Sequence, residues 1–130
     1  MPPDVTPDPK SRSLTRGRPK YRRHVAGPKQ WQRIADEKQG PCRVCGSVEA
    51  NGRLYGKIQF HHLVSREDRG DDLPENIVPL CSRDHELVTQ RNSQACSVLL
   101  ATLDDAEYAY MVERGGENYA ERAYGMEYRR

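Results

Sequence analysis

Residues 58–85 read IQFHHLVSREDRGDDLPENIVPLCSRDH, and their pattern predicts the centre of the domain. The apolar run that leads into it, Leu54 to Phe60, predicts a β-strand that ends at a pair of histidines. A polar loop rich in Arg, Asp and Gly follows from Ser65 to Glu75. The short apolar run Asn76 to Leu80 then predicts a second strand, so we expect two strands joined by a long polar loop.

Helices are expected on both sides of these strands. Lys29 to Gln39 carries Trp31, Ile34 and Ala35 at helical spacing and should end at Gly40-Pro41. A turn at Asn51-Gly52 leads into the first strand. The helical candidates after the second strand are Asp84 to about Leu100 with a break at Asn92-Ser93, Asp104 to Glu113, and Glu117 to Ala123. Together these elements predict a small α+β domain with flanking helices.

The composition predicts a core that needs additional stabilisation from a bound metal ion or from disulfides. Of the 130 residues, 35% are hydrophobic and 31% are charged. A small domain with so few hydrophobic residues can bury only a small hydrophobic core. The N-terminus shows no basic and then apolar leader, and no apolar run is long enough to cross a bilayer. We therefore expect a cytoplasmic, reducing environment and no membrane partner. In such a compartment a C-x-x-C pair binds metal or acts in redox chemistry more often than it forms a structural disulfide.

Four cysteines supply candidates for this stabilisation. Cys42 and Cys45 form a C-x-x-C knuckle followed by Gly46, and Cys81 directly follows the second predicted strand. Short chelating turns of this kind hold structural Zn²⁺ in a tetrahedron. A second C-x-x-C would place its last ligand at position 84, where the chain has an aspartate. The candidates for the fourth ligand are Asp84, His85 and Cys96. The alternative is a redox pair or plain buried thiols.

The N-terminal part of the chain is strongly basic. Residues 1–28 are rich in Pro, Arg, Lys and Ser without a hydrophobic period, which predicts disorder. No Asp or Glu occurs between residues 10 and 33, and the basic side chains there are Lys10, Arg12, Arg16, Arg18, Lys20, Arg22, Arg23, Lys29 and Arg33. Such a run is typical of an arm that binds DNA phosphates. Its predicted contacts are Arg18, Lys20, Arg22 and Arg23, and a tail that merely aids solubility is the alternative.

The histidines carry the predicted chemistry. His61 and His62 end the first strand, and His85 lies in the helix after the second. Hydrolysis of a phosphodiester needs an activated water and a cation that offsets charge on the phosphoryl and leaving oxygens. A neutral histidine is a suitable base near pH 7, and two more histidines can hold one divalent ion. His24 is interpreted as part of the basic arm.

These residues and their order resemble the HNH endonuclease family, which has the ββα-metal (His-Me finger) fold. The features are the His61-His62 pair, Gly70-Asp71-Asp72, the ENIVPLC run at residues 75–81, and His85. The resemblance implies that His61 and His85 are ligands of a catalytic metal and that His62 is the general base. Asn76 matches the family's middle residue, which either ligates the metal or braces the loop that orients the base. The implied reaction is hydrolysis of DNA, as nicks or double-strand breaks.

One position departs from the family pattern. Many relatives carry another metal-binding histidine one helical turn after the last one, and the chain has Thr89 there. The ion would then rest on His61 and His85, with Asn76 as an optional third protein ligand and waters and phosphate completing the shell. An open shell of this kind suits Mg²⁺ or Mn²⁺, which keep several waters, better than a tightly held catalytic zinc.

Other polar side chains have two interpretations each. The loop carboxylates are expected to be turn formers and solvated charges rather than metal ligands; they are Glu67, Asp68, Asp71 and Asp72. The candidates for phosphate clamps, with surface ion pairs as the alternative, are Arg66, Arg69 and Arg83. The C-terminal tyrosines are expected to fill the core and interfaces rather than stack on bases; they are Tyr108, Tyr119 and Tyr124.

The chain is expected to divide into a disordered basic arm (1–28), an HNH domain with zinc knuckles (29–101) and a C-terminal helical extension (102–130). The ERAYG stretch at residues 121–125 resembles small phage-encoded members. This likeness implies the cytoplasm of a bacterial host, with phage terminase or packaging proteins as candidate partners beside DNA. Two alternatives to an endonuclease stay open: a non-catalytic zinc-knuckle DNA-binding module, and an accessory subunit of a phage packaging complex.

Overall fold

The computed structural model describes residues 22–48 and 57–130. The elements in these ranges are α1 (Pro28–Lys38), β1 (Ile58–His62), η3 (Arg66–Asp68), η4 (Pro74–Asn76), β2 (Ile77–Cys81), α2 (Ser82–Thr89), α3 (Ser93–Thr102), α4 (Asp105–Gly115) and α5 (Tyr119–Tyr124). The predicted small α+β domain is therefore confirmed. The predicted turn at Asn51-Gly52, the start of the strand at Leu54, and the arm residues Arg18 and Lys20 lie outside the described residues.

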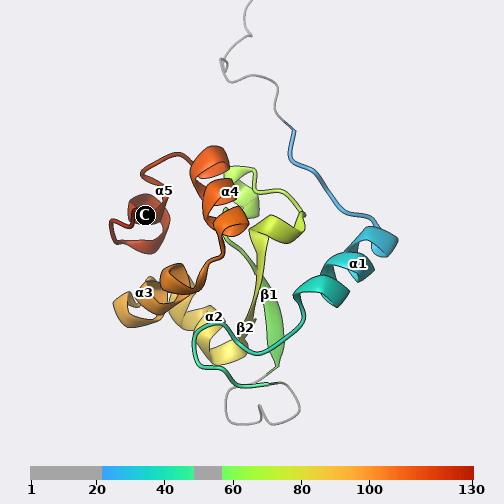
Figure 1. Cartoon of the computed structure of the whole chain (residues 1–130), viewed down its shortest axis with the longest axis horizontal. Coiled ribbons are helices and arrows are strands. Elements are labelled where there is room, and N and C mark those ends of the chain that lie inside the picture. The colour runs from blue at the N-terminus through green and yellow to red at the C-terminus, as the bar shows by residue number, and fades with distance from the viewer. Residues whose placement is uncertain (1–21, 49–56) are drawn as a thin grey trace, which may run out of the picture.

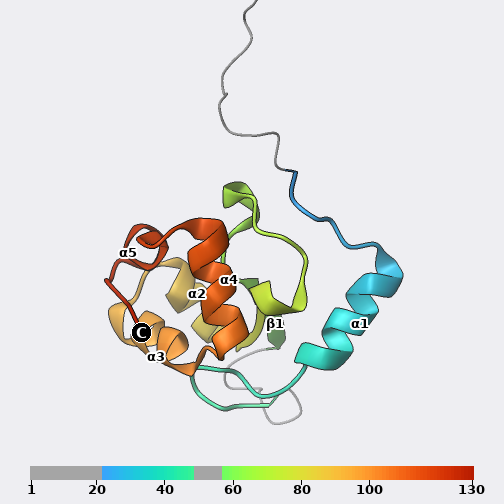
Figure 2. The ribbon, with the colours of Figure 1, turned by 45° about the horizontal axis from the view of Figure 1, so that its top comes forward.

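The two strands pair antiparallel. Ile58 lies opposite Cys81 and His62 lies opposite Ile77, so the histidine pair and Cys81 lie at opposite ends of the sheet. The sheet stands between α1 on one side and α3, α4 and α5 on the other (Figures 1 and 2). Helix α2 begins directly after β2 and packs on both strands. Residues of α2 therefore lie beside Cys81 at the end of β2 and also beside β1.

The helix ends follow local signals in the sequence. Pro28 occupies the first turn of α1, where its missing N–H costs nothing. The predicted break between α2 and α3 is confirmed, because the Asn92 side chain accepts a hydrogen bond from the Ala95 amide and caps α3. Asp104 and Glu107 form a capping box at the start of α4. Each of these positions could be recognised from residue type alone.

The core has two parts. The larger part lies between the sheet and the C-terminal helices, and it includes Leu80, Leu99, Met111 and Tyr119. The smaller part, made by Ala26, Ile34 and Ile77 with the half-buried Trp31 and Phe60, fixes α1 to the sheet. The expected role of the α1 stripe in packing is confirmed, and Tyr119 and Tyr124 are buried as expected.

The segment before α1 differs from the sequence prediction. Residues 22–27 were expected within the disordered arm, but they form an extended segment held by the polar loop. The Asp72 amide donates to the carbonyl oxygen of His24, and the Ala26 amide donates to the Asp72 carboxylate at 3.0 Å. Composition could not reveal this attachment, because the two partners are more than 40 residues apart in the sequence.

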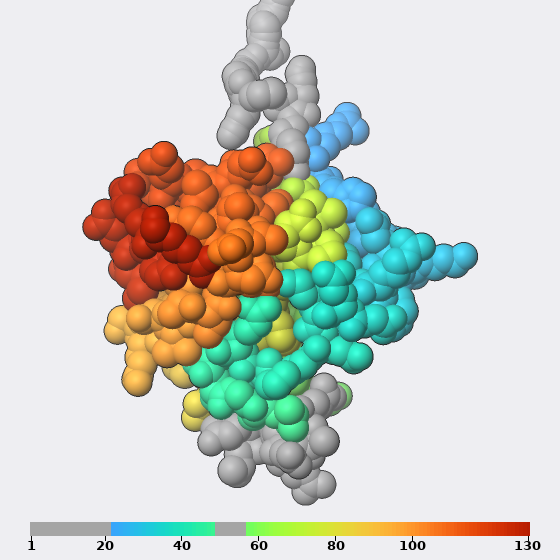
Figure 3. All heavy atoms as spheres, viewed as in Figure 1, coloured from blue at the N-terminus to red at the C-terminus, as the bar shows by residue number. Residues whose placement is uncertain are grey.

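A buried carboxylate ties α4 to two other segments. Glu107 is fully buried, and its carboxylate accepts hydrogen bonds from Arg43 at 2.9 and 2.8 Å and from Lys38 at the end of α1. Burial raises its pKa, but the two cations and the Asp104 amide outweigh burial and lower the pKa to about 2. Figure 3 shows the segment after α1 lying against α4 on this face of the molecule.

Candidate functional site

Three histidines gather at one open hollow in the surface. The strand end supplies His61 and His62, and α2 supplies His85. The residues that line the hollow are Phe60, His61, His62, Ser65, Arg66, Glu67, His85 and Thr89. The ring centroids of His61 and His85 are 5.3 Å apart. The structure therefore brings together the three histidines that the sequence singled out for chemistry.

The two neighbours on β1 point to different sides, as alternation along a strand requires. His61 Nε2 lies 2.9 Å from the hydroxyl oxygen of Tyr124 in α5. His62 Nε2 lies 2.8 Å from Asp72 Oδ1 in the polar loop. His85 Nδ1 lies 2.6 Å from Gln59 Oε1 on β1. Each ring is thus held through one nitrogen, which leaves the other available.

All three histidines are neutral near pH 7. Burial, with smaller contributions from His85 and His62, lowers the pKa of His61 to about 3. Burial also lowers the pKa of His62, although the hydrogen bond to Asp72 opposes the shift. The pKa of His85 is lowered by burial and by His62. A neutral imidazole has one lone-pair nitrogen, which can bind a metal or take a proton.

Asn76 is buried and braces the loop. Its side-chain oxygen accepts a hydrogen bond from the Val64 amide at 2.8 Å, and its side-chain nitrogen donates to the carbonyl oxygens of Val64 at 3.1 Å and Asp71 at 2.9 Å. Gly70 belongs to the same brace, since a Cβ there would lie 1.7 Å from Val64 O. Of the two roles left open for Asn76, these bonds support bracing rather than metal ligation.

Two loop carboxylates contradict the expectation of solvated charges. Asp71 and Asp72 are buried, with 2% and 1% of their surfaces exposed. Asp72 accepts hydrogen bonds from His62, from the Ala26 amide and from Arg23. Burial raises its pKa, but these donors outweigh burial and lower it, so the carboxylate is charged. The sequence showed Asp72 in the resembling motif but gave no sign of its contact with His62. Glu67 and Asp68 are exposed, as predicted.

The predicted DNA-binding arginines lie in different places. Arg66 lines the hollow, with 58% of its side chain exposed. Arg69 is exposed on the same loop, and Arg22 is exposed at the start of the attached segment. Arg83, whose side chain is half exposed, lies 3.5 Å from the buried Asp84 and does not line the hollow. Arg23 binds the Gly70 carbonyl oxygen and Asp72 within the protein.

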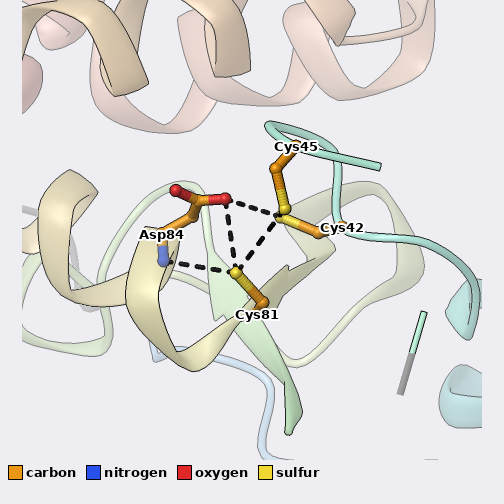
Figure 4. A group of neighbouring side chains, drawn as sticks. All are labelled: Cys42, Cys45, Cys81 and Asp84. Carbon is orange, nitrogen blue, oxygen red and sulfur yellow. Dashed lines mark hydrogen bonds between the residues drawn. The ribbon is translucent and has the colours of Figure 1, made fainter. Parts of the chain in front are cut away.

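A second group of side chains forms a candidate metal centre (Figure 4). Ligand atoms of Cys42, Cys45, Cys81 and Asp84 all lie within 4.8 Å of one another. Asp84 Oδ2 is 3.3 Å from the sulfur atoms of both Cys42 and Cys81, and the sulfur atoms of Cys45 and Cys81 are 3.8 Å apart. Zinc–sulfur bonds of about 2.3 Å in a tetrahedron give sulfur–sulfur edges of roughly 3.8 Å. The spacing therefore fits one tetrahedral ion.

The chemistry of the cluster also fits a cation. Burial raises the pKa values of the Cys42 and Cys81 thiols, whereas hydrogen bonds from the thiols outweigh burial and lower the pKa of Asp84. A bound cation would favour the thiolates. Cys96 is held elsewhere, with its sulfur 3.7 Å from the Val88 carbonyl oxygen. Because His85 lies at the hollow, the arrangement favours Asp84 among the three candidates for fourth ligand.

The fold and the two sites define a small α+β domain consistent with the ββα-metal class, in which a strand pair and a helix present histidines to one hollow. Residues 42–91 match the family model described as HNH endonuclease. This match confirms the resemblance to the HNH family that the sequence showed. Comparison with curated proteins and with solved structures gave no match.

The family match carries a broad functional meaning. HNH domains are generally nucleases, so the match implies nuclease-type activity with DNA as the substrate class, and a requirement for metal. Among the described residues, no helix combines the length and the apolar character needed to cross a membrane.

Proposed function

We propose that the protein is a metal-dependent endonuclease that hydrolyses phosphodiester bonds of DNA at the histidine-lined hollow. The observation that supports this most directly is the convergence of His61, His62 and His85, from a strand end and a helix, on one open surface hollow. An open hollow admits a DNA backbone, and neutral histidines supply both a base and ligand atoms.

His62 is the proposed general base. A carboxylate has no proton to donate, so the 2.8 Å contact requires that His62 Nε2–H donates to Asp72. His62 Nδ1 then keeps its lone pair and accepts the proton of the attacking water. The charged Asp72 also stabilises the imidazolium that forms in this step. Asn76 contributes by bracing the loop from which Asp72 reaches His62.

His61 and His85 are the proposed protein ligands of the catalytic ion. They are neutral, and their rings lie together at the hollow. With two imidazoles, and with Thr89 in place of a third, the site suits Mg²⁺ or Mn²⁺. When bound, such an ion offsets the negative charge that develops on the phosphoryl and leaving oxygens. The side-chain atoms of Asn76 are used in the loop, so we do not include it among the ligands.

The cysteine cluster is proposed to hold a structural Zn²⁺. Cys42, Cys45, Cys81 and Asp84 would enclose it without an open position, and a closed set of protein ligands is typical of structural rather than catalytic zinc. The cluster joins the segment after α1 to the end of β2 and the start of α2. Zinc there would therefore stabilise the helix that presents His85.

DNA is proposed to cross the hollow beside Arg66. The exposed Arg69 and Arg22 and the arm residues Arg18 and Lys20 would contact flanking phosphates, which supply affinity more than sequence choice. Arg66 lies 3.9 Å from Asp72, but its side chain is largely exposed. Arg23 is less suited to this role, because its side chain is only 22% exposed and binds both Asp72 and the Gly70 carbonyl oxygen. Arg83 pairs with Asp84 and does not line the hollow.

The alternatives drawn from the sequence are not favoured. A non-catalytic zinc-knuckle module would use the cysteines and the arm but would leave three convergent histidines without a role. The comparisons give no support for phage packaging partners. Nuclease activity therefore remains the proposal to test first.

The test is a plasmid nicking assay with Mg²⁺, with Mn²⁺ and with EDTA. The wild-type protein should nick in the presence of either ion and be inactive with EDTA. His62→Ala removes the proposed base and should lower the rate on the order of 10²–10⁴-fold, with folding and zinc content unchanged. His24→Ala is the matched control, because His24 is exposed and lies outside the hollow. Nicking by His62→Ala at the wild-type rate would contradict the assignment.

A further inference from the structure

Three tyrosine hydroxyls from the C-terminal helices bind the chain that follows β1. Tyr110 of α4 accepts from the Asp71 amide at 2.8 Å and donates to the Asp71 carboxylate at 2.6 Å. Tyr119 of α5 accepts from the Ser65 amide at 3.0 Å and donates to Asp68 at 2.9 Å. The expectation that Tyr119 fills the core therefore leaves out its hydroxyl, and Tyr110 was not among the tyrosines for which the sequence predicted that role.

Tyr124 differs from the other two because its hydroxyl reaches a histidine. The hydroxyl oxygen lies 2.6 Å from the carbonyl oxygen of Leu63 and 2.9 Å from His61 Nε2. Tyr124 is buried in α5, outside the segment that matches the HNH family model. Nothing in the family match therefore assigns it to the site.

The direction of each hydrogen bond follows from the groups involved. A carbonyl oxygen can only accept, so the Tyr124 hydroxyl donates its proton to Leu63 O. The same hydroxyl must then accept from His61, which places a proton on His61 Nε2. In the neutral tautomer that has its proton on Nε2, the lone pair is on Nδ1.

A hydrogen bond also fixes the tautomer of His85, the second proposed ligand. The 2.6 Å contact between His85 Nδ1 and the side-chain oxygen of Gln59 places a proton on Nδ1 and the lone pair on Nε2. Both rings are thus held by one acceptor each while they lie 5.3 Å apart at the hollow. Holding the second nitrogen of a ligand histidine in this way fixes its tautomer and orientation.

We propose that Tyr124 is a positioning residue that fixes the tautomer and ring orientation of His61, so that Nδ1 is the atom offered to the divalent ion. The part that concerns the ion rests on the proposed function, whereas the tautomer does not. Helix α5 then contributes a positioning residue to the site in addition to packing against the core. Loss of the hydroxyl should weaken ion binding by about 10- to 100-fold.

The experiment uses the full chain with its structural zinc and compares Tyr124→Phe with Tyr119→Phe. Both variants keep a buried aromatic ring in α5 and lose a hydroxyl that makes two hydrogen bonds, but only Tyr124 contacts a histidine. Nitrogen-15 NMR of the histidine rings, without added Mg²⁺ or Mn²⁺, reports the tautomer. We expect His61 to carry its proton on Nε2 in the wild type and in Tyr119→Phe, and to become a mixture in Tyr124→Phe.

A Mn²⁺ titration followed by electron paramagnetic resonance gives the second readout. Tyr124→Phe should bind Mn²⁺ about 10- to 100-fold more weakly than Tyr119→Phe. The inference is overturned if wild-type His61 carries its proton on Nδ1, if Tyr124→Phe leaves the tautomer unchanged, or if the two variants bind Mn²⁺ equally. A wild type with the expected tautomer and Mn²⁺ affinity that fails to nick DNA would contradict the proposed function instead.

Discussion

His62 and Asp72 are ten residues apart in the sequence, and their side chains meet at 2.8 Å. The histidine could be recognised from its place at a strand end, but its partner could not. A carboxylate in a Gly-Asp-Asp loop ordinarily forms turns in solvent. Here the loop folds back on Asn76 and the segment before α1 closes over it, so Asp72 is buried. Burial makes the hydrogen bond to His62 a determinant of the ring's orientation.

Replacing Asp72 by Asn tests that role. The amide can present an NH₂ group to His62 and has no charge to stabilise the imidazolium. Hydrogen bonds to charged groups contribute about 1.5–3 kcal/mol, so we expect the turnover of DNA cleavage to fall about 10- to 100-fold. The control is Asp36→Asn, an exposed aspartate of α1. The idea fails if Asp72→Asn, folded and zinc-loaded, turns over DNA like the control.

The metal centre yields a prediction that depends on which thiol is changed. Purified protein should contain about one zinc per chain by elemental analysis. Cys42→Ser should lose that zinc and much of the folding stability, because structural zinc binding contributes folding free energy directly. Cys96→Ser is the matched control, since Cys96 is equally buried but lies outside the cluster. Full zinc content in Cys42→Ser, or absence of zinc in the folded wild type, would argue against the site.

At the scale of the elements, local signals predicted the helices and strands, and distant contacts determined the rest. Gly40-Pro41 marks the end of α1, and Asn92-Ser93 marks the start of α3. Both helix ends are determined by residues next to them in the sequence, so they could be predicted. The tyrosine hydroxyls and the Arg43–Glu107 pair join residues more than 35 positions apart, which periodicity cannot report. For the same reason the histidines of the site could be named from the sequence, while their second partners could not.

Glu107 shows how one such contact affects stability. Its pKa is lowered from 4.5 to about 2 in the folded protein. A lowered pKa means that the carboxylate stabilises the fold above its unfolded pKa, and that this stabilisation is lost as pH falls from about 4.5 toward 2. Glu107→Gln should therefore lower the free energy of unfolding at pH 7 by about 2 kcal/mol.

Urea denaturation at several pH values checks this. The gap in unfolding free energy between wild type and Glu107→Gln should be constant from pH 7 to about 5 and then narrow below pH 4.5. Zinc release in acid would affect both proteins, so the difference between them is the quantity to follow. Glu113→Gln, an exposed change in the same helix, should show little gap at any of these pH values. A gap that widens in acid would contradict the assigned direction.

At the scale of the whole molecule, the basic segment and the site are physically joined. Residues 22–27 run along the polar loop, and Arg23 binds the same carboxylate oxygen of Asp72 that His62 contacts. The arm therefore enters the domain beside the proposed base. Affinity for DNA and the arrangement of the base should then be separable, because they depend on different parts of the N-terminal region.

Two truncations and one substitution separate these contributions. Deleting residues 1–21 removes the basic side chains Lys10, Arg12, Arg16, Arg18 and Lys20 but keeps the attached segment. We expect weaker DNA binding, a shallower salt dependence and unchanged turnover. The slope of the logarithm of the binding constant against the logarithm of salt concentration should fall by about 0.9 for each DNA phosphate that the arm no longer neutralises.

Deleting residues 1–27 should lower turnover as well, because Asp72 is then without Arg23 and the Ala26 amide. Arg23→Ala in the full chain should reproduce part of this fall in turnover while changing the salt slope by no more than the value for a single phosphate. If the shorter deletion lowers turnover and leaves binding and its salt dependence intact, the arm does not act through DNA phosphates.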